Sequence, residues 1–305
     1  MHILLTGATG FLGNNLQGEL QKRYQVTGVG SEWDLRDQER CRILLGFYKP
    51  DVVIHAAGTV GGIGANKENP GKFMYENLIM GTNMIHESMN NSISKFILLG
   101  TVCSYPKHTK VPFKEEDIWN GYPEETNAPY GIAKKTLMQM LISYKEQYGF
   151  NGVNLIPVNM YGPYDHFNLT SSHVIPALIL KIHNAIIEDR SEIIIWGTGN
   201  ASREFLFAED CSEAISLAIE KDISPDPINI GTGSEIKIIE LVRIIADIMG
   251  FQGIIKCDDS KPDGQPRRCL DTSKAKQVLG FEAKTDLNTG LQKTIDWFLN
   301  KQNRG

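Results

Sequence analysis

The sequence predicts an α/β fold, a Rossmann-type doubly wound parallel sheet followed by a smaller C-terminal lobe that binds the substrate. Three observations lead to this prediction. Strand-like and helix-like patterns alternate through the first half of the chain, a glycine-rich turn follows the first strand, and the alternation breaks up after Asn159. With 305 residues and 41% hydrophobic content, the chain can bury a core of that size.

The alternating half is expected to form the dinucleotide-binding domain, residues 1–158, to which segments near 190–222 return. Its expected strands are residues 3–6, 25–29, 52–55, 95–99 and 153–157, and its expected helices are 11–23, 36–47, 69–90 and 129–148. The smaller lobe is expected over residues 159–305. There the patterns predict helices at 173–187, 208–220, 236–249 and 287–300, and strands at 193–196 and 227–230.

The turn after the first strand has the glycine spacing of a phosphate-binding loop. It runs G-x-x-G-x-x-G through Gly7, Gly10 and Gly13, with Phe11 and Leu12 opening an amphipathic helix. Glycines allow a tight turn and close approach of the backbone to a pyrophosphate, whose charge the free N–H groups at a helix start attract. These five residues are therefore predicted to bind a dinucleotide.

The end of the second strand normally distinguishes NAD from NADP. No lysine or arginine stands at Gly30 or Ser31, and Arg36 is expected to begin the next helix. Glu32 fits contact with a ribose and fits a solvated surface equally well, so the phosphate state of the cofactor stays open.

Further cofactor contacts are expected where the next segments approach the glycine turn. The small residues that close the third strand suit a backbone lying against the cofactor, and two residues past the second strand are assigned to the same site. These predicted contacts are Ala56, Ala57, Gly58, Asp34 and Leu35.

The catalytic candidates are Tyr130 and Lys134, which stand four residues apart in an expected helix. This spacing places both side chains on one face. A neighbouring ammonium favours the phenolate and lowers a pKa that is near 10 in water. Thr101, at the end of the preceding strand, can offer its hydroxyl to the same substrate oxygen. A bare Y-x-x-x-K is common in helices, and it is the glycine turn that favours a catalytic role here.

Cys103 and His173 form an acid–base pair if the fold brings them together. Taken singly, each has a simpler explanation: Cys103 as a small core residue, and His173 as a histidine at a helix start.

Composition argues against several other classes of protein. A net charge of −5, with no basic cluster interleaved with aromatic residues, gives no reason to expect nucleic acid. Five cysteines without C-x-x-C spacing indicate neither a metal site nor a disulfide framework, and favour a reducing cytoplasm. No apolar run has the length of a membrane span.

The motifs together resemble the extended short-chain dehydrogenase/reductase family, and within it the subgroup of GDP-L-fucose synthases, which are GDP-4-keto-6-deoxymannose 3,5-epimerase/4-reductases. The likeness runs nearly end to end. It is carried by residues 60–63, 103–107, 125–134, 159–163, 172–178, 196–197, 203–205 and 260–264.

The resemblance implies a role for each catalytic candidate. Tyr130 would protonate the C4 oxygen, and Lys134 would hold the nicotinamide ribose. Thr101 would stand where the family has serine. Cys103 and His173 would move protons at C3 and C5.

The resemblance also implies ligands and an assembly. The substrate is a GDP-sugar, the cofactor is NADP(H), and two long helices form a homodimer. The residues carried over to the substrate are Asn159, Lys181 (an arginine in the family), Trp196, Arg203 and Lys261.

The sequence departs from the family at positions that bear on specificity. Thr9 and Gly30 replace arginines that hold the 2′-phosphate of NADP, which leaves NAD(H) open. Thr101-Val102 replaces two serines and is compatible with another GDP-sugar. Two alternatives therefore remain: a GDP-hexose or GDP-heptose 4-reductase or 4-dehydrogenase without double epimerisation, and a non-catalytic dinucleotide-sensing Rossmann protein.

Overall fold

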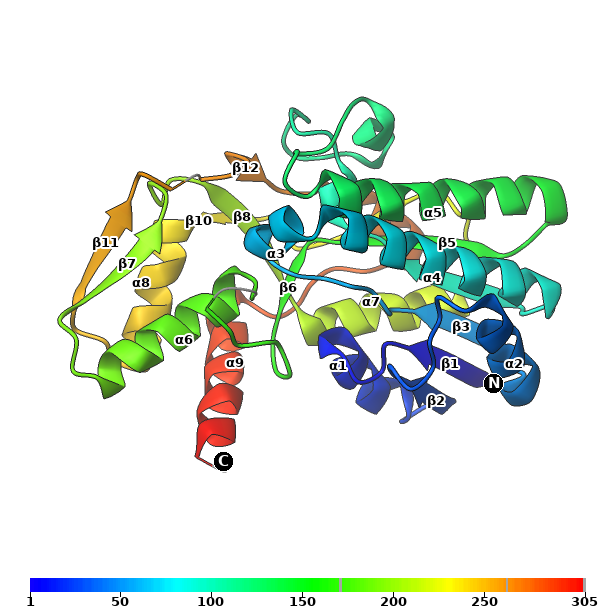
Figure 1. The fold of residues 1–305 in the computed structure, drawn as a ribbon, viewed down its shortest axis with the longest axis horizontal. Coiled ribbons are helices and arrows are strands. Elements are labelled where there is room, and N and C mark those ends of the chain that lie inside the picture. The colour runs from blue at the N-terminus through cyan, green and yellow to red at the C-terminus, as the bar shows by residue number, and fades with distance from the viewer. Residues whose placement is uncertain (170–171, 262, 304–305) are drawn as a thin grey trace.

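The computed structural model of the chain describes residues 1–169, 172–261 and 263–303, which form a larger and a smaller lobe (Figure 1). The larger lobe is built around a six-stranded parallel sheet, and this confirms the predicted fold class. Across the sheet the strands follow the order β2 (Gln25–Val29), β1 (His2–Thr6), β3 (Val52–His55), β4 (Lys95–Leu99), β5 (Gly152–Pro157) and β9 (Ile228–Ile230).

The strand order reverses at β1, because β2 lies on one side of it and β3 on the other. In open α/β sheets, ligands bind outside the carboxyl ends of the strands at such a reversal. The register is in step there: Thr6 pairs with Val29 of β2 and with His55 of β3. The turns that follow these three strands therefore meet at one edge of the sheet.

Helices cover both faces of the sheet (Figure 1). On one face lie α1 (Phe11–Leu20) and α7 (Ala208–Glu220). On the other face lie α2 (Gln38–Tyr48), α4 (Pro70–Asn90) and α5 (Ala128–Tyr148). The short helix α3 (Ile63–Glu68) precedes α4.

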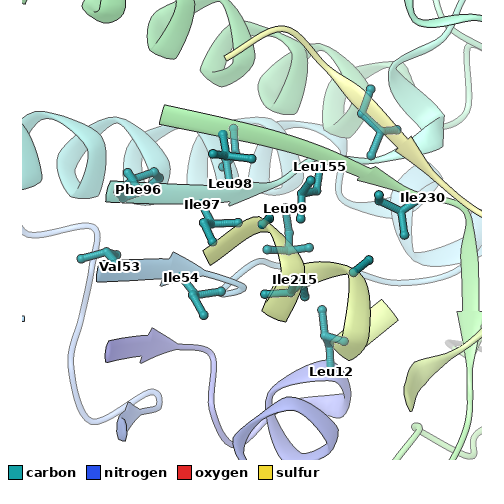
Figure 2. Packing of buried hydrophobic residues seen from close by; sticks show 14 of the residues in the cluster. Leu12, Val53, Ile54, Phe96, Ile97, Leu98, Leu99, Leu155, Ile215 and Ile230 are labelled. Atoms are coloured by element: carbon teal, nitrogen blue, oxygen red, sulfur yellow. The ribbon is translucent and has the colours of Figure 1, made fainter. Parts of the chain in front are cut away.

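The core of the larger lobe fills the space between these layers. All five residues of β4 are buried, as expected for a central parallel strand with helices on both faces. In Figure 2, Ile97 lies on the side of Ile215 and Leu12, which come from α7 and α1, whereas Leu98 lies on the opposite side.

The smaller lobe combines two small sheets with a second hydrophobic core. The central strand β8 (Ser202–Phe207) pairs with β6 (Asn159–Tyr161), β10 (Glu235–Lys237) and β12 (Arg267–Arg268). A separate parallel pair is formed by β7 (Glu192–Trp196) and β11 (Ile254–Asp258). The helices that build this core are α6 (Val174–Ile187), α8 (Ile238–Met249) and α9 (Leu287–Gln302).

Three further short helical segments lie at Val102–Ser104, Glu115–Trp119 and Ala275–Leu279. Within the stretch 190–222, α7 packs against the large sheet, whereas β7 belongs to the smaller lobe. Among the described residues, no helix combines the length and the apolar character needed to cross a bilayer.

Two helix starts were predicted two residues too early. Helix α2 begins at Gln38 because the Asp37 carboxylate caps its first N–H groups, so Arg36 lies in the preceding loop. Residues 236–237 were expected in a helix but belong to β10, which pairs with β8.

The strands β6, β8, β10, β11 and β12 were not predicted. In β8 the polar residues Arg203 and Glu204 interrupt the apolar run, and their partners lie far away in the sequence.

Candidate active site

The glycine turn after β1 is held tightly against the end of β3. Gly7 has a φ of 71°, and a Cβ added there would lie 2.7 Å from the backbone nitrogen of Ala57. A Cβ on Gly13 would lie 2.1 Å from the carbonyl oxygen of Gly7. Only glycine fits at these two positions. The turn therefore presents backbone and the first N–H groups of α1, as a pyrophosphate site requires.

The residues after β2 are engaged with the protein. The guanidinium of Arg36 forms two hydrogen bonds with the Asp34 carboxylate, of 2.8 and 2.9 Å, and contacts Glu76 at 3.1 Å. Leu35 is buried in the core, and its carbonyl accepts a hydrogen bond from Asn83. Asp34 can still reach a ligand with its exposed edge, whereas Leu35 can contribute only its backbone.

Lys134 reaches the same edge of the sheet from α5. A Cβ built on Gly58, just past β3, would lie 3.8 Å from Lys134 Nζ. The lysine is 4% exposed, and burial lowers its pKa to about 8. His55, at the end of β3, donates to or accepts from Thr6 and has a pKa lowered to about 3 by burial and by Lys134. His55 is therefore neutral, and Lys134 supplies the positive charge beside β3.

Tyr130, Thr101 and Cys103 come together where α5 meets the loop after β4. The side chain of Thr101 accepts a hydrogen bond from the backbone N–H of Cys103 at 3.2 Å. Burial raises the pKa of the Tyr130 phenol, the charge of a Cys103 thiolate raises it further, and a hydrogen bond with Thr101 lowers it in part. The expectation of a lowered tyrosine pKa is therefore wrong for this structure, because Lys134 makes no contribution to it and burial dominates.

Gly131 lets the start of α5 lie directly on this loop. A Cβ there would lie 2.3 Å from the carbonyl oxygen of Cys103. The Ser104 hydroxyl adds a hydrogen bond of 3.0 Å to the Gly131 carbonyl. Close packing of helix and loop thus fixes Tyr130 relative to Thr101 and Cys103.

Two arginines stand beside Cys103. Arg268 of β12 is opposite Arg203 of β8 in the strand register, and Arg268 Nη1 lies 3.7 Å from Cys103 Sγ. Burial and the charge of Arg268 lower the pKa of Arg203 to about 10. Their hydrogen-bond acceptors are the carbonyls of Ser202 and Asp263, the side chain of Gln265 and the Cys103 thiol.

Two neighbouring cations whose partners here are neutral groups favour an anionic ligand. Arg268 was not among the predicted site residues. The only sequence signal for it was the pair Arg267-Arg268 after the motif at 260–264.

Glu204, which follows Arg203 in β8, fixes the backbone segments that carry the two arginines. Its carboxylate is fully buried and accepts backbone N–H groups of Thr232 at 2.5 Å, Gly233 at 2.8 Å and Leu270 at 2.6 Å. These bonds tie β8, the turn after β9 and the end of β12 together. Asn159 joins the same assembly by donating to the Glu204 carbonyl at 3.0 Å.

His173 lies immediately before α6 and is exposed. Surrounding protein atoms displace part of its hydration and lower its pKa, and the charge of His166 adds to this effect. Among the residues that the structure describes, no hydrogen bond joins His173 to Cys103 or Tyr130. The proposed pairing of Cys103 with His173 stays a prediction.

The remaining predicted substrate residues lie on the smaller lobe. Lys181 of α6 donates to the carbonyl of Ile194 in β7 at 2.6 Å. Trp196 ends β7 with 65% of its surface exposed, and Lys261 is exposed in the loop after β11. An exposed indole at a strand end is available for stacking against a ligand.

Comparison with known proteins bears directly on this arrangement. Residues 3–231 match the model of the NAD dependent epimerase/dehydratase family. The chain is 44% identical over 266 residues to a GDP-L-fucose synthase of Sinorhizobium fredii, covering 87% of this chain and 84% of the relative. It is 41% identical to a GDP-L-colitose synthase of Yersinia pseudotuberculosis, covering 99% of both chains.

A solved structure has the same fold over nearly the whole chain. The GDP-mannoheptose C4 reductase of Campylobacter jejuni, determined with NADP bound, superposes with a TM-score of 0.88 at 30% identity, covering 98% of each chain. The chain belongs to the NAD dependent epimerase/dehydratase family, in the extended short-chain dehydrogenase/reductase class.

Proposed function

We propose that this enzyme is a GDP-sugar epimerase/reductase that converts GDP-4-keto-6-deoxymannose, or a close analogue, into GDP-L-fucose or the corresponding product. The observation that carries the proposal is the cluster of Tyr130, Thr101 and Cys103 beside the arginine pair, of which Arg268 is buried and Arg203 partly buried. A proton donor, a thiol and an anion site close together fit a nucleotide sugar whose chemistry occurs next to its diphosphate.

The tyrosine is in the protonation state that reduction needs. When a hydride reaches C4, the ketone oxygen becomes an alkoxide and requires a proton. Because burial raises the pKa of Tyr130, its phenol stays protonated at neutral pH and can donate. Thr101 orients this group and offers a second hydrogen bond to the same oxygen. A bound reduced nicotinamide supplies the hydride.

Epimerisation uses the same oxygen stabilisation. C3 and C5 flank the C4 ketone, so removal of a proton from either carbon gives an enolate whose charge Tyr130 and Thr101 stabilise. Cys103 lies beside them and is assigned the proton transfer on one face. His173 is assigned the return of the proton on the other face.

The two arginines fit the diphosphate of the substrate. Guanidinium groups bind phosphate oxygens through paired N–H donors. An anion placed between Arg203 and Arg268 also relieves their mutual repulsion. Lys181, Trp196 and Lys261 would contact the rest of the GDP group.

The nicotinamide dinucleotide fits the edge formed by the turns after β1 and β3. NADP is bound in the homologous heptose reductase, and the glycine turn and Lys134 offer the same type of site here. Gly7, Gly10, Phe11, Leu12 and Gly13 would hold the pyrophosphate. The remaining predicted contacts, Asp34, Leu35, Ala56, Ala57 and Gly58, would border the two riboses.

Assembly, compartment and domain limits are part of the proposal. We assign a homodimer formed by α4 and α5, which lie side by side (Figure 1) and carry exposed aromatic residues such as Tyr75 and Tyr148. The free state of all five cysteines supports a cytoplasmic location. The domains are residues 1–158 and 159–305, with α7 and β9 completing the first.

The deciding experiment supplies the purified protein with GDP-4-keto-6-deoxymannose and either NADPH or NADH, and identifies the product sugar by NMR. Formation of GDP-L-fucose supports the proposal. Formation of an unepimerised 6-deoxyhexose would replace it with a simple 4-reductase. Absence of turnover with a panel of GDP-4-keto sugars would revive the dinucleotide-sensing alternative.

A GDP-hexose or GDP-heptose 4-reductase is the second candidate. Two observations favour it: the likeness to the C. jejuni heptose reductase, and the fact that no hydrogen bond among the described residues joins His173 to Cys103. Exchange of substrate protons with heavy water in the absence of reduced cofactor separates the two functions, because only an epimerase must enolise its substrate.

A further inference from the structure

A carboxylate occupies the tip of β2. Glu32 Oε1 accepts a hydrogen bond from the backbone N–H of Gly30 at 2.7 Å. A Cβ placed on Gly30 would lie 2.8 Å from Glu32 Oε2 and 2.8 Å from Thr9 Oγ1. Glu32, Gly30 and Thr9 therefore meet at one point. The loop conformation places the charge there, because the glutamate folds back onto its own turn.

This point adjoins the glycine turn, where the dinucleotide is proposed to bind. Thr9 belongs to the glycine turn, and the N–H of Ala8 donates to the carbonyl of Val29 at the end of β2. In a Rossmann fold, the ribose of the adenosine lies at the tip of β2, where an acidic residue accepts from its 2′-hydroxyl and a basic residue accommodates a 2′-phosphate. Glu32 lies at this tip.

The carboxylate of Glu32 has no ion-pair partner in the part of the chain that the structure describes. Arg36 is the nearest arginine in sequence, and its guanidinium is already bound to Asp34 and Glu76. Within residues 1–169, 172–261 and 263–303, none of the ion pairs includes Glu32. A 2′-phosphate would therefore approach an unpaired anion, whereas a 2′-hydroxyl would find an acceptor.

We infer that Glu32 is a specificity-determining residue that makes this enzyme bind NAD(H) more tightly than NADP(H). The inference rests on the proposed function only in placing a nicotinamide dinucleotide in this cleft. A charge-assisted hydrogen bond to the 2′-hydroxyl is gained and a repulsive contact with the phosphate is avoided. The combined preference is on the order of ten- to a hundredfold.

The test measures binding by calorimetry with four probes: NADH, NADPH, 5′-AMP and 2′,5′-ADP. The last two isolate the adenosine end of the cofactor. Glu32→Gln removes the charge and keeps an amide oxygen that can accept the Gly30 N–H. Glu146→Gln, an exposed glutamate near the far end of α5, is the matched control.

The wild type and the control are expected to prefer NADH and 5′-AMP by about tenfold or more, and Glu32→Gln should abolish or reverse that preference. Raising the salt concentration should weaken the wild-type discrimination, because the carboxylate is exposed, and should leave the Glu32→Gln ratio nearly unchanged. A merely structural glutamate would alter the affinity for both cofactors equally.

Two results would overturn the inference: a wild-type preference for NADPH and 2′,5′-ADP, or a ratio that Glu32→Gln leaves unchanged. Failure of the proposed function gives a different pattern. In that case none of the four probes binds, or both cofactors bind and no GDP-4-keto sugar is turned over.

Discussion

Replacing Gly131 by alanine tests whether contact between α5 and the loop after β4 positions Tyr130, the proposed proton donor. The added Cβ would lie 2.3 Å from the carbonyl oxygen of Cys103 and 2.9 Å from its carbonyl carbon, whereas ordinary contact begins at 3.4 Å. Both neighbours are backbone atoms and cannot rotate away. The helix or the loop must therefore shift by about 1 Å, which also stretches the hydrogen bond from Ser104 to the Gly131 carbonyl.

Two magnitudes follow from that shift. Overpacking of this kind lowers the free energy of unfolding by about 1–3 kcal/mol. A displacement of about 1 Å between Tyr130 and the reacting oxygen can lower turnover on the order of a hundredfold. Binding of the cofactor pyrophosphate at the glycine turn should change little, because Gly7 and Gly13 lie on another loop.

The assay compares Gly131→Ala with Gly46→Ala, a helical glycine of α2 around which an added Cβ would meet nothing within 4 Å. The control should be stabilised by up to about 1 kcal/mol, the helix-propensity gain of alanine over glycine. Urea unfolding and reduction of a GDP-4-keto sugar are measured for both variants. If Gly131→Ala keeps turnover within about threefold of wild type and matches the stability of the control, the positioning argument is wrong.

Four further outcomes are expected. Tyr130→Phe should lower reduction by about 10²–10⁴-fold with little effect on cofactor binding, and a variant that keeps more than about a third of wild-type turnover would contradict its role as proton donor. Cys103→Ser should slow the uptake of deuterium at C3 and C5, measured by NMR in heavy water, while hydride transfer continues. His173→Asn should impair reprotonation of these carbons. If wild type reduces a substrate into which no deuterium enters, the pair has no epimerase role. Glu204→Gln replaces a carboxylate that accepts hydrogen bonds from three backbone N–H groups. The free energy of unfolding, measured in urea, should fall by about 2–4 kcal/mol, and an unchanged urea midpoint would show that these bonds do not stabilise the fold. Burial lowers the pKa of Lys134 from 10.5 to about 8, so between these pH values the unfolded chain binds more protons than the folded protein. As the pH rises through this window, the free energy of unfolding of the wild type should increase relative to that of Lys134→Met by up to about 3 kcal/mol. Parallel pH profiles for the two proteins would show that the lysine is not desolvated.

The parts of the site that could be predicted are those encoded within one turn or one crossover. The spacing of Gly7 and Gly13 prescribes where a Cβ is forbidden, and the structure has backbone atoms at both places. Likewise, Tyr130 lies near Thr101 because one crossover joins the end of β4 to the start of α5. Such contacts depend on local geometry, which the sequence pattern contains.

The parts that could not be predicted depend on pairing between distant segments. Arg268 meets Cys103 across 165 residues, through a two-residue strand that has no alternating pattern. The pKa of Tyr130 was predicted in the wrong direction for a related reason. Its value depends on burial by the surrounding fold, whereas the sequence spacing to Lys134 reports only a possible neighbour.

Under the proposed function, the charges along the carboxyl edge of the sheet would give each ligand its own place. Glu32 follows β2, Lys134 lies beside the end of β3, and the pair Arg203 and Arg268 flanks the loop after β4. Under the proposed function the sugar diphosphate would bind at the last of these, because the two guanidinium groups offer paired N–H donors to its oxygens, whereas the carboxylate of Glu32 would repel it. Between the two binding regions burial keeps Tyr130 protonated, so the proton is available where the sugar and the nicotinamide would meet.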